Sequence, residues 1–575
     1  MIKTITLSNS WLSLRRLFFV AFFLLFAAVI SFCLFYLLSG HDYLVSWYLQ
    51  LNDCIYNSGQ WGADFFTPGI KSDGNMYCIA AMIIAIGGIS YILKRIRTKD
   101  LILKYPLVIS YDTGNILPVI IALASTTALW LWGNKMALPA YDEVFSAQNA
   151  AGINPFQCIS YYMQPNNHLF FNFVNNILFH PSIDKVITGR VISLFAYSGF
   201  IVVIFFLFKQ LIKNRWLALL VSITLANQFF IWGFSFQARG YELYLLTEWG
   251  SFISLFSYLV SAQKRWLYVN LLCIAFGYFC LPSMLYIHAA QLLFVCLHQL
   301  VYKKKEILFW KYQVAAGLLS FLFYLPTLSF SGMESITHNN YVAPMGFKTV
   351  SAFLAWVLPY FRTYIGHIFS NIQWHGINFS ITLVFLPFIL LLARKNKPYF
   401  LFGLFYLCMW VTFFLIASAM KRVPFERNLI GHYSITFAGV ILVVYWLSGI
   451  VSKGAVSVAF KWVLFPAFLT LFIIHFIRTD KIFLKDTLYE YNVNEGYNFK
   501  KNWLSIIPSG CTVACSDEEF YATYICRKNG CIVSRCPTGN ENYFVKYVSE
   551  QLPPAYVDRY ELINDTWGYQ IYRRK

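Results

Sequence analysis

The residues best suited to chemistry are concentrated between positions 141 and 190 of a chain that otherwise consists largely of apolar runs. Within a few tens of residues this stretch combines paired carboxylates, amides, a histidine and an arginine. The residues that could act on a substrate are Tyr141, Asp142, Glu143, Asn167, His168 and Arg190. Polar groups gathered between membrane-length segments indicate a functional site.

The acidic pair Asp142 and Glu143 offers proton-transfer chemistry. A carboxylate that neighbouring aromatic side chains partly desolvate can accept a proton from a hydroxyl at neutral pH. Adjacent side chains point in different directions, so one acid could be catalytic while the other is structural or a metal ligand. The alternative interpretation is that both are ordinary solvated loop charges.

Asn167 and His168 belong to a segment, residues 166–172, whose pattern predicts the start of a helix with a polar edge. No second histidine follows four residues after His168, so the sequence lacks the spacing of a metal-binding pair on one helix face. We therefore interpret Asn167 and His168 as hydrogen-bonding residues that position a substrate.

Three arginines, Arg190, Arg239 and Arg427, are expected on the same side of the membrane as the acidic pair. A planar guanidinium binds a phosphate through two parallel hydrogen bonds, and a charge at a membrane edge persists where it finds an anionic partner. The alternative is a plain ion pair with a neighbour such as Glu242 or Glu426.

Composition decides the class of protein that positions these residues. Of 575 residues, 58% are hydrophobic and only 12% are charged, and the mean hydropathy is +0.56. A soluble chain of this length could not bury that much apolar surface, so we predict an all-α polytopic membrane protein. The excess of 45 basic over 26 acidic residues lies mainly in short clusters between apolar runs, which indicates topology and excludes a nucleic-acid partner.

About thirteen transmembrane helices are expected from apolar runs of suitable length. They lie at 17–38, 76–93, 116–132, 191–208, 216–234, 241–260, 267–280, 284–300, 314–328, 377–392, 400–419, 433–450 and 462–477. Arg15 and Arg16 precede the first run, which is long enough to span and lacks a small-residue cleavage pattern, so we expect a retained anchor.

The basic clusters predict the orientation. Those at 94–97, 209–215, 264–265, 303–305 and 394–397 fall on one side if every span is crossed in turn, and that side is expected to be cytoplasmic. The N-terminus is then cytoplasmic and residues 141–190 face outward, in a bacterial inner membrane with a periplasmic tail. Merging the two runs around Pro282 into one broken helix would reverse every later loop.

Two extramembrane segments are expected on the outer side. Residues 329–376 form a long loop with an interfacial helix around 350–364 that would cover a site. From Thr479 the apolar runs become short, which predicts a small extracytoplasmic α+β domain with a helix at 543–552 and a β-hairpin at 560–572.

Five cysteines stand close together in that domain: Cys511, Cys515, Cys526, Cys531 and Cys536. Their spacing lacks a paired C-x2-C set, and the compartment should be oxidising, so disulfides are favoured over zinc. The domain division is therefore 1–113 for an N-terminal two-helix membrane hairpin and cytoplasmic loop, 114–478 for a catalytic core with outward loops 134–190 and 329–376, and 479–575 for the C-terminal domain.

The order of these features resembles the GT-C superfamily of membrane glycosyltransferases, in particular the protein O-mannosyltransferase and lipid A aminoarabinose transferase group (families 39 and 83). Five features carry the resemblance: Tyr141-Asp142-Glu143 opens an outward loop, Asn167-His168 follows, Arg190 begins the next span, Ala238-Arg239-Gly240-Tyr241 comes two spans later, and Glu426-Arg427 lies near the last spans.

The resemblance implies inverting transfer of a sugar from a polyprenyl-phosphate donor to a glycan, lipid or protein acceptor on the extracytoplasmic side. Asp142 would be the general base, with Glu143 as its neighbour or alternate. Arg239 and Arg427 would hold the lipid phosphate, together with Arg190, Asn167, His168 and Tyr141 as further substrate contacts. Membrane lipids would be the other partners.

Two departures from the family pattern affect these assignments. The acidic loop of the family commonly follows the first span, but here two further spans, 17–38 and 76–93, come before that span. This added hairpin offers Asp53, Asp64 and Asp73 as a rival acidic set. No separate D-x-D motif is present on the expected outer side, so we expect no cofactor, with Mg²⁺ or Mn²⁺ as the alternative.

Two other classes of function compete with a glycosyltransferase. A transporter or flippase for lipid-linked substrates would show internal repeats and mid-span ionisable residues, of which the chain offers only Glu248, His288 and His298. A polysaccharide polymerase or ligase would use outward arginines with a larger late loop.

Overall fold

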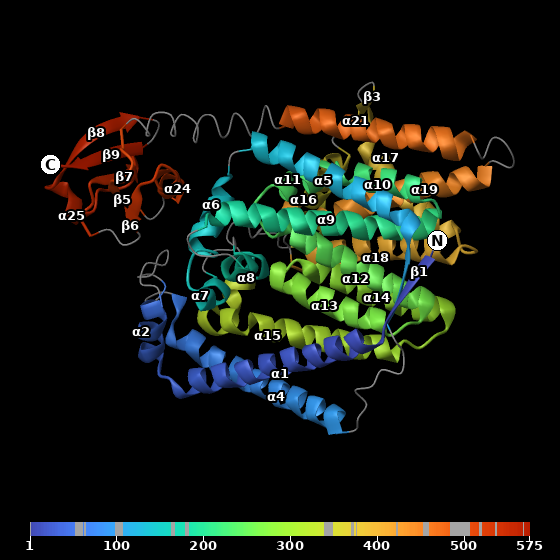
Figure 1. Ribbon diagram of the computed structural model, residues 1–575, viewed down its shortest axis with the longest axis horizontal. Helices are drawn as coiled ribbons and strands as arrows, with labels where there is room; N and C mark the ends of the chain where they lie inside the picture. The colour runs from blue at the N-terminus through green and yellow to red at the C-terminus, as the bar shows by residue number, and fades with distance from the viewer. Residues whose placement is uncertain are drawn as a thin grey trace.

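Figure 1 shows the architecture of the 575-residue chain in a computed structural model. The structure describes residues 2–51, 61, 65–97, 107–137, 139–162, 167–178, 183–337, 349–369, 373–374, 377–420, 424–451, 459–483, 506–516, 520–534, 538–566 and 569–575.

Within these ranges the chain is a bundle of membrane-length helices with a small sheet domain at its C-terminal end, which confirms the predicted fold class. Ten helical segments are long and apolar enough to cross a membrane. They lie in α1 (Ser8–Leu38), α4 (Pro68–Arg97), α5 (Ile116–Met136), α9 (Lys185–Ile212), α12 (Tyr241–Ser261), α14 (Met284–Tyr302), α15 (Ile307–Thr337), α18 (Lys397–Met420), η4–α19 (Glu426–Leu429 and Ile430–Val451) and η5–α21 (Phe460–Leu464 and Phe465–Phe483).

Each of the thirteen expected spans corresponds to helix in the structure, but three of them are not single full-length helices. The run at 216–234 is broken into α10 (Arg215–Ala226) and α11 (Phe229–Ser235), bent by 73°. The runs at 267–280 and 377–392 form the shorter α13 (Arg265–Cys280) and the pair α17 (Ser380–Phe385) and η3 (Leu386–Leu392). The described chain thus has ten full-length spans, or eleven with the bent pair.

The bend between α10 and α11 is stabilised by amide side chains. Asn227 donates from Nδ2 to the Ile223 carbonyl at 2.8 Å, and Gln228 donates from Nε2 to the Ile368 carbonyl at 3.0 Å. The Gln228 carbonyl then accepts the first hydrogen bond of α11, from the Trp232 amide. In an apolar medium a broken helix persists only where its freed backbone groups find such partners. The run around Pro282, by contrast, is two helices, α13 and α14.

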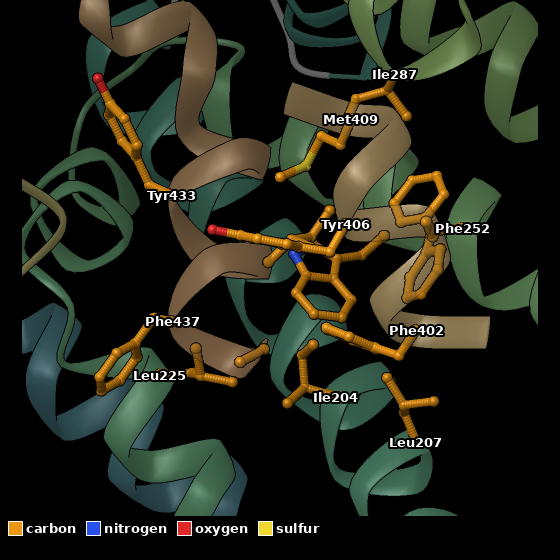
Figure 2. Close-up of a cluster of buried hydrophobic side chains, with 14 of the residues drawn as sticks. Ile204, Leu207, Leu225, Phe252, Ile287, Phe402, Tyr406, Met409, Tyr433 and Phe437 are labelled. Atoms are coloured by element: carbon orange, nitrogen blue, oxygen red, sulfur yellow. The ribbon is translucent and has the colours of Figure 1, made fainter. Parts of the chain in front are cut away.

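The interior of the bundle is filled by aromatic and branched side chains (Figure 2). Phe252 of α12 and Phe405 of α18 stack with ring centroids 4.3 Å apart, and Tyr406 donates from its hydroxyl to the Val384 carbonyl at 2.5 Å. Trp249 donates to the Ser434 hydroxyl at 2.7 Å, which joins α12 to α19. Because lipid offers no hydrophobic drive between helices, such close packing and hydrogen bonding hold the bundle together.

A buried amide cluster joins α12, α13, α14 and α15 in the same way. Asn270 donates to Gln291 Oε1 at 2.9 Å and to the Ser251 carbonyl at 2.8 Å, and accepts from Gln313 Nε2 at 2.8 Å. His288 extends the chain through Gln313 Oε1 at 3.0 Å. These satisfied polar groups fix how the helices pack.

The N-terminal helices α1 and α4 pack on each other and against α15. Next to them, α2 (His41–Leu51) contributes Tyr48 to a series of stacked aromatic rings. The ring centroids are 4.1 Å apart between Tyr48 and Trp61, 5.2 Å between Trp61 and Phe66, and 5.2 Å between Phe66 and Phe330 of α15. This aromatic stack attaches the hairpin to the bundle.

The expected interfacial helix is present as α16 (Val350–Ile368), which packs against α11, α17, α18 and α19. Phe353, Val357 and Ile365 are buried, whereas Val350 and Leu354 are exposed, so the helix is amphipathic. Residues 338–348 of the preceding loop lie outside the described chain.

The C-terminal domain contains a five-stranded sheet in the order β6-β5-β7-β9-β8. Its strands are β5 (Thr512–Cys515), β6 (Ile532–Ser534), β7 (Tyr543–Tyr547), β8 (Tyr560–Thr566) and β9 (Tyr569–Arg574), and the helix α24 (Phe520–Lys528) connects the parallel strands β5 and β6. The predicted hairpin is confirmed as the antiparallel pair β8–β9.

Two expectations about this domain are corrected. The segment 543–552 is not a helix but begins with β7, whose Phe544 and Val545 fill the core between neighbouring strands. Cys511, Cys515, Cys526 and Cys531 are free thiols rather than disulfides, and the last three are buried in the domain as small apolar residues. Cys536 lies outside the described residues.

Candidate functional site

The acidic pair stands in the first turn of a short helix, α6 (Tyr141–Asn149), at the end of the bundle that faces the C-terminal domain (Figure 1). The Ala140 amide donates to Glu143 Oε1 at 2.9 Å, so this carboxylate caps the helix that contains it. Acidic side chains in a first turn also complement the helix dipole. Tyr141 begins the helix, and its side chain lies outside what the structure describes.

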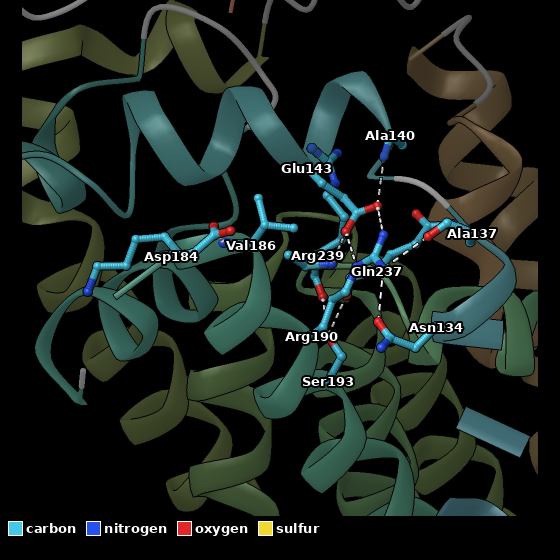
Figure 3. Close-up of polar contacts among 12 residues, drawn as sticks. Asn134, Ala137, Ala140, Glu143, Asp184, Val186, Arg190, Ser193, Gln237 and Arg239 are labelled. Atoms are coloured by element: carbon cyan, nitrogen blue, oxygen red, sulfur yellow. Dashed lines mark hydrogen bonds and ion pairs between the residues drawn. The ribbon is translucent and has the colours of Figure 1, made fainter. Parts of the chain in front are cut away.

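Glu143 makes a bidentate ion pair with Arg190 of α9 (Figure 3). Arg190 Nε donates to Oε2 at 2.9 Å and Nη2 donates to Oε1 at 3.1 Å, with the carboxylate side chain 1% exposed and the guanidinium 8%. The remaining Arg190 nitrogen, Nη1, donates to Asn134 Oδ1 and the Ala137 carbonyl. Every charged atom of this pair is therefore engaged within the protein.

The same carboxylate also fixes the loop before α12. The Ala238 amide donates to Glu143 Oε2 at 2.8 Å, and Ser193 of α9 donates to the Gln237 carbonyl at 2.7 Å (Figure 3). Gly189 allows the loop to approach, because a Cβ there would lie 2.7 Å from the Ala238 Cβ. Glu143 thus ties α6, α9 and the loop 236–240 into one unit.

Asp142 does not share the partners of Glu143 and lies between the other two arginines. Its Oδ2 is 3.6 Å from Arg239 Nη2 and 3.3 Å from Arg427 Nη1. Arg427 also stacks on Phe425, 4.7 Å from the ring centroid. The Asp142 and Arg427 side chains are 36% and 37% exposed, so this pair is open to a ligand while Arg239 is buried.

Arg239 is held from several directions. Its Nη1 donates to the Asp142 carbonyl and to Ser146 Oγ, both at 3.1 Å, and its Nη2 lies 3.4 Å from the Tyr241 hydroxyl. Burial alone would lower the pKa of Arg239, but Tyr241 and Asp142 outweigh that effect and raise the pKa above its usual value. The buried guanidinium is therefore a fixed positive charge.

His168 contacts the loop that contains Arg239, and Asn167 precedes it in the chain. The His168 ring packs edge-on against Tyr241 with centroids 4.7 Å apart, and its Nδ1 is buried without a hydrogen-bond partner in the described chain. Asn167 donates to the Cys158 and Tyr161 carbonyls at 3.0 Å each, which fixes the turn before α8 (Leu169–Leu178). Burial, followed by the charges of Arg239 and Arg427, lowers the pKa of His168 well below its usual value.

The structure therefore brings together the residues predicted for the glycosyltransferase site whose side chains it describes. It separates them into a closed pair, Glu143–Arg190, and a more open trio, Asp142–Arg239–Arg427. Arg239 pairs with Asp142 and not with Glu242, which was the alternative. Of the rival acidic set, Asp73 is exposed on α4, and Asp53 and Asp64 lie outside the described residues.

Several residues that complete this arrangement have no distinctive sequence pattern. Asn134, Ser146 and Ser193 are isolated polar residues whose roles depend on tertiary contacts. In the part of the chain that the structure describes, no three His, Cys, Asp or Glu side chains are grouped as a metal site would require.

No protein-family model and no curated protein matches the chain. Among solved structures, ArnT from Cupriavidus metallidurans bound to undecaprenyl phosphate is similar with a TM-score of 0.49 at 12% identity, over 79% of this chain and 97% of that chain. The oligosaccharyltransferase AglB from Archaeoglobus fulgidus, in complex with an inhibitory peptide and a dolichol-phosphate, is similar with a TM-score of 0.41 at 10% identity. This similarity covers 76% of the present chain and 69% of AglB.

Arabinosyltransferase EmbB from Mycobacterium smegmatis is similar with a TM-score of 0.39 at 12% identity, over 70% of this chain and 42% of that chain.

The closed pair predicts a large stability effect. Glu143→Ala leaves the Arg190 guanidinium buried without its counter-ion, which costs about 3–5 kcal/mol of folding free energy. Thermal unfolding of the detergent-solubilised protein should show a clearly lowered midpoint. The matched control is Glu561→Ala, which removes a Glu–Arg pair that is 44% and 55% exposed and should lower the midpoint far less. Equal shifts in the two variants would contradict this assignment.

His168 predicts a pH dependence of stability. The folded protein keeps the imidazole neutral, whereas the unfolded chain takes up a proton below a pH of about 6.5. Stability conferred by neutral His168 is therefore present above that pH and falls by up to about 1.4 kcal/mol per pH unit below it. Between pH 7 and pH 5 the unfolding midpoint of the wild type should fall more steeply than that of His168→Gln, and parallel curves would refute the prediction.

Proposed function

We propose that this protein is an integral membrane glycosyltransferase that transfers a sugar from a polyprenyl-phosphate-linked donor to the hydroxyl of an acceptor. The observation that carries the proposal is the position of Asp142 between Arg239 and Arg427. Two guanidinium groups and one carboxylate, at the end of a membrane bundle, provide both a phosphate site and a base.

The two arginines suit the phosphate of the donor. Arg239 is preorganised by its contacts with Ser146 and Tyr241, and Arg427 is half-exposed. Fixed cations that face a leaving phosphate stabilise the transition state more than the ground state, because charge develops there as the sugar leaves. We assign Arg190 to positioning α6, because its Nε and Nη2 atoms both donate to the Glu143 carboxylate.

Asp142 is the base in this proposal. The donor phosphate pairs with part of the positive charge of Arg239 and Arg427. The Asp142 carboxylate then accepts the proton of the acceptor hydroxyl. The hydroxyl oxygen attacks the anomeric carbon while the bond from that carbon to the phosphate oxygen breaks on the opposite face. The products are a glycosylated acceptor of inverted configuration and a polyprenyl phosphate.

The proposed orientation follows from the helix order. Four basic clusters lie where membrane helices end or begin on the side of the bundle opposite α6. They are residues 209–215, 264–265, 303–305 and 394–397. We infer from the bias of Lys and Arg that this opposite end is cytoplasmic. The site and the C-terminal domain then face the extracytoplasmic side, where the acceptor is a glycan, a lipid or a protein.

The first test removes the base. Asp142→Asn keeps the size of the side chain but cannot take up the proton, so sugar transfer should fall by at least about 10²-fold. Mass spectrometry of lipids that co-purify with both proteins should still find a polyprenyl-phosphate sugar. Full activity of the variant would exclude Asp142 as the base, and an ordinary phospholipid set in the wild type would exclude the proposed donor.

The second test removes a phosphate ligand. Arg427→Ala deletes one of the two cations and should weaken binding of the lipid-linked donor by about 10-fold or more, as expected for a charge-assisted hydrogen bond. Binding is measured by titration of the purified protein with donor. Arg215→Ala, an exposed arginine at the other end of the bundle, is the matched control. Unchanged donor affinity in Arg427→Ala would leave only the ion pair with Asp142 as its role.

A further inference from the structure

In the described part of the C-terminal domain, the helix α24 packs against α6 of the site. In Figure 1 α24 lies on the side of the domain that faces α6. More than 330 residues separate these helices in the sequence, so no local pattern could predict the contact. Tyr524 and Lys528 of α24 also reach Asp184, the residue before α9.

Asp184 receives both side chains. It is the N-cap of α9, where its Oδ1 accepts from the Val186 amide at 2.9 Å. Its other oxygen, Oδ2, lies 2.5 Å from Lys528 Nζ and accepts from the Tyr524 hydroxyl at 3.3 Å. One carboxylate therefore caps the helix that contains Arg190 and anchors the C-terminal domain.

The ring of Tyr524 reaches further into the site. It packs against a small buried cluster that includes Val144 of α6, Val186 of α9 and Ala238 of the loop before α12. Figure 3 shows Asp184 and Val186 beside the contacts of Glu143 with Arg190 and the loop 236–240. These three residues are close in sequence to residues of the site. Val144 follows Glu143, Val186 precedes Arg190 by one helical turn, and Ala238 precedes Arg239.

We propose that Tyr524 and Lys528 are positioning residues, and that the C-terminal domain completes the catalytic site by holding α6 against α9 and the loop 236–240. The inference rests on the proposed function and deepens it. Tyr524 touches neither the donor nor the acceptor. It sets the distance between Asp142, on α6, and Arg239, on the loop.

This contact should affect rate more than folding. A displacement of about 1 Å between a base and its substrate can reduce the rate by about 10²-fold. The Glu143–Arg190 pair holds α6 independently of α24, so loss of the tyrosine ring should loosen the helix without unfolding the bundle. The C-terminal sheet has its own core, which includes Val513, Val545 and Ile571.

The test compares side-chain variants of the full-length protein. Tyr524→Ala removes the ring and should lower kcat by about 10- to 100-fold, with a smaller change in KM for the donor. Tyr524→Phe keeps the ring and should stay within about threefold of the wild type. Lys528→Met should lower kcat modestly and Lys528→Arg should restore it, while Arg573→Met, which breaks an exposed ion pair of the same domain, is the control.

Hydrogen–deuterium exchange gives a readout that does not depend on activity. Amides of α6, residues 141–149, should exchange faster in Tyr524→Ala than in the wild type, and those of α12 should not change. If α6 exchange and kcat both stay at the wild-type level, the positioning role is wrong. If the wild type transfers no sugar but α6 still loosens in Tyr524→Ala, the coupling holds and the proposed glycosyl transfer fails.

Discussion

The buried pair between Glu143 and Arg190 is the interaction on which the rest of the site depends. Two charges taken out of water are costly, and the cost is offset only when geometry is good and every remaining hydrogen-bonding atom is satisfied. Here the carboxylate also accepts from the Ala140 and Ala238 amides, and the guanidinium also donates to Asn134 and the Ala137 carbonyl. The pair therefore joins three segments of chain and leaves Asp142, one residue away, facing a different direction.

Much of the membrane fold could be predicted because lipid imposes a simple rule on length and apolarity. The amphipathic α16 and the hairpin β8–β9 were predictable for similar reasons, since periodicity and turn residues are local. The bend at Asn227 and Gln228 was not, because the Gln228 side chain finds its partner at Ile368, 140 positions away. The strand β7 was mistaken for a helix because its apolar run is short and its strand partners β5 and β9 lie elsewhere in sequence.

The sequence indicated which residues form the site better than it indicated which of them form ion pairs with one another. Adjacent acids at positions 142 and 143 must point in different directions, which is a local fact of the backbone. Glu143 pairs with Arg190, and Asp142 with Arg239 and Arg427, because of how α6, α9, the loop before α12 and η4 pack. The spacing of these residues in the sequence does not indicate that packing. Tyr524 shows the same limit, because an ordinary tyrosine on a surface helix acquires its role only through the position of Asp184 and Ala238.

The charge balance of the open trio explains how one site could drive the proposed transfer. Asp142 opposes two guanidinium groups, so one positive charge is left for the substrate. A donor phosphodiester has one negative charge, whereas the phosphate monoester released has about 1.5 to 2 near neutral pH. In the proposed transfer the site would therefore bind the leaving group more tightly as the sugar departs, which would lower the barrier. Passage of the proton gained by Asp142 to that phosphate would then restore the starting charge of the site.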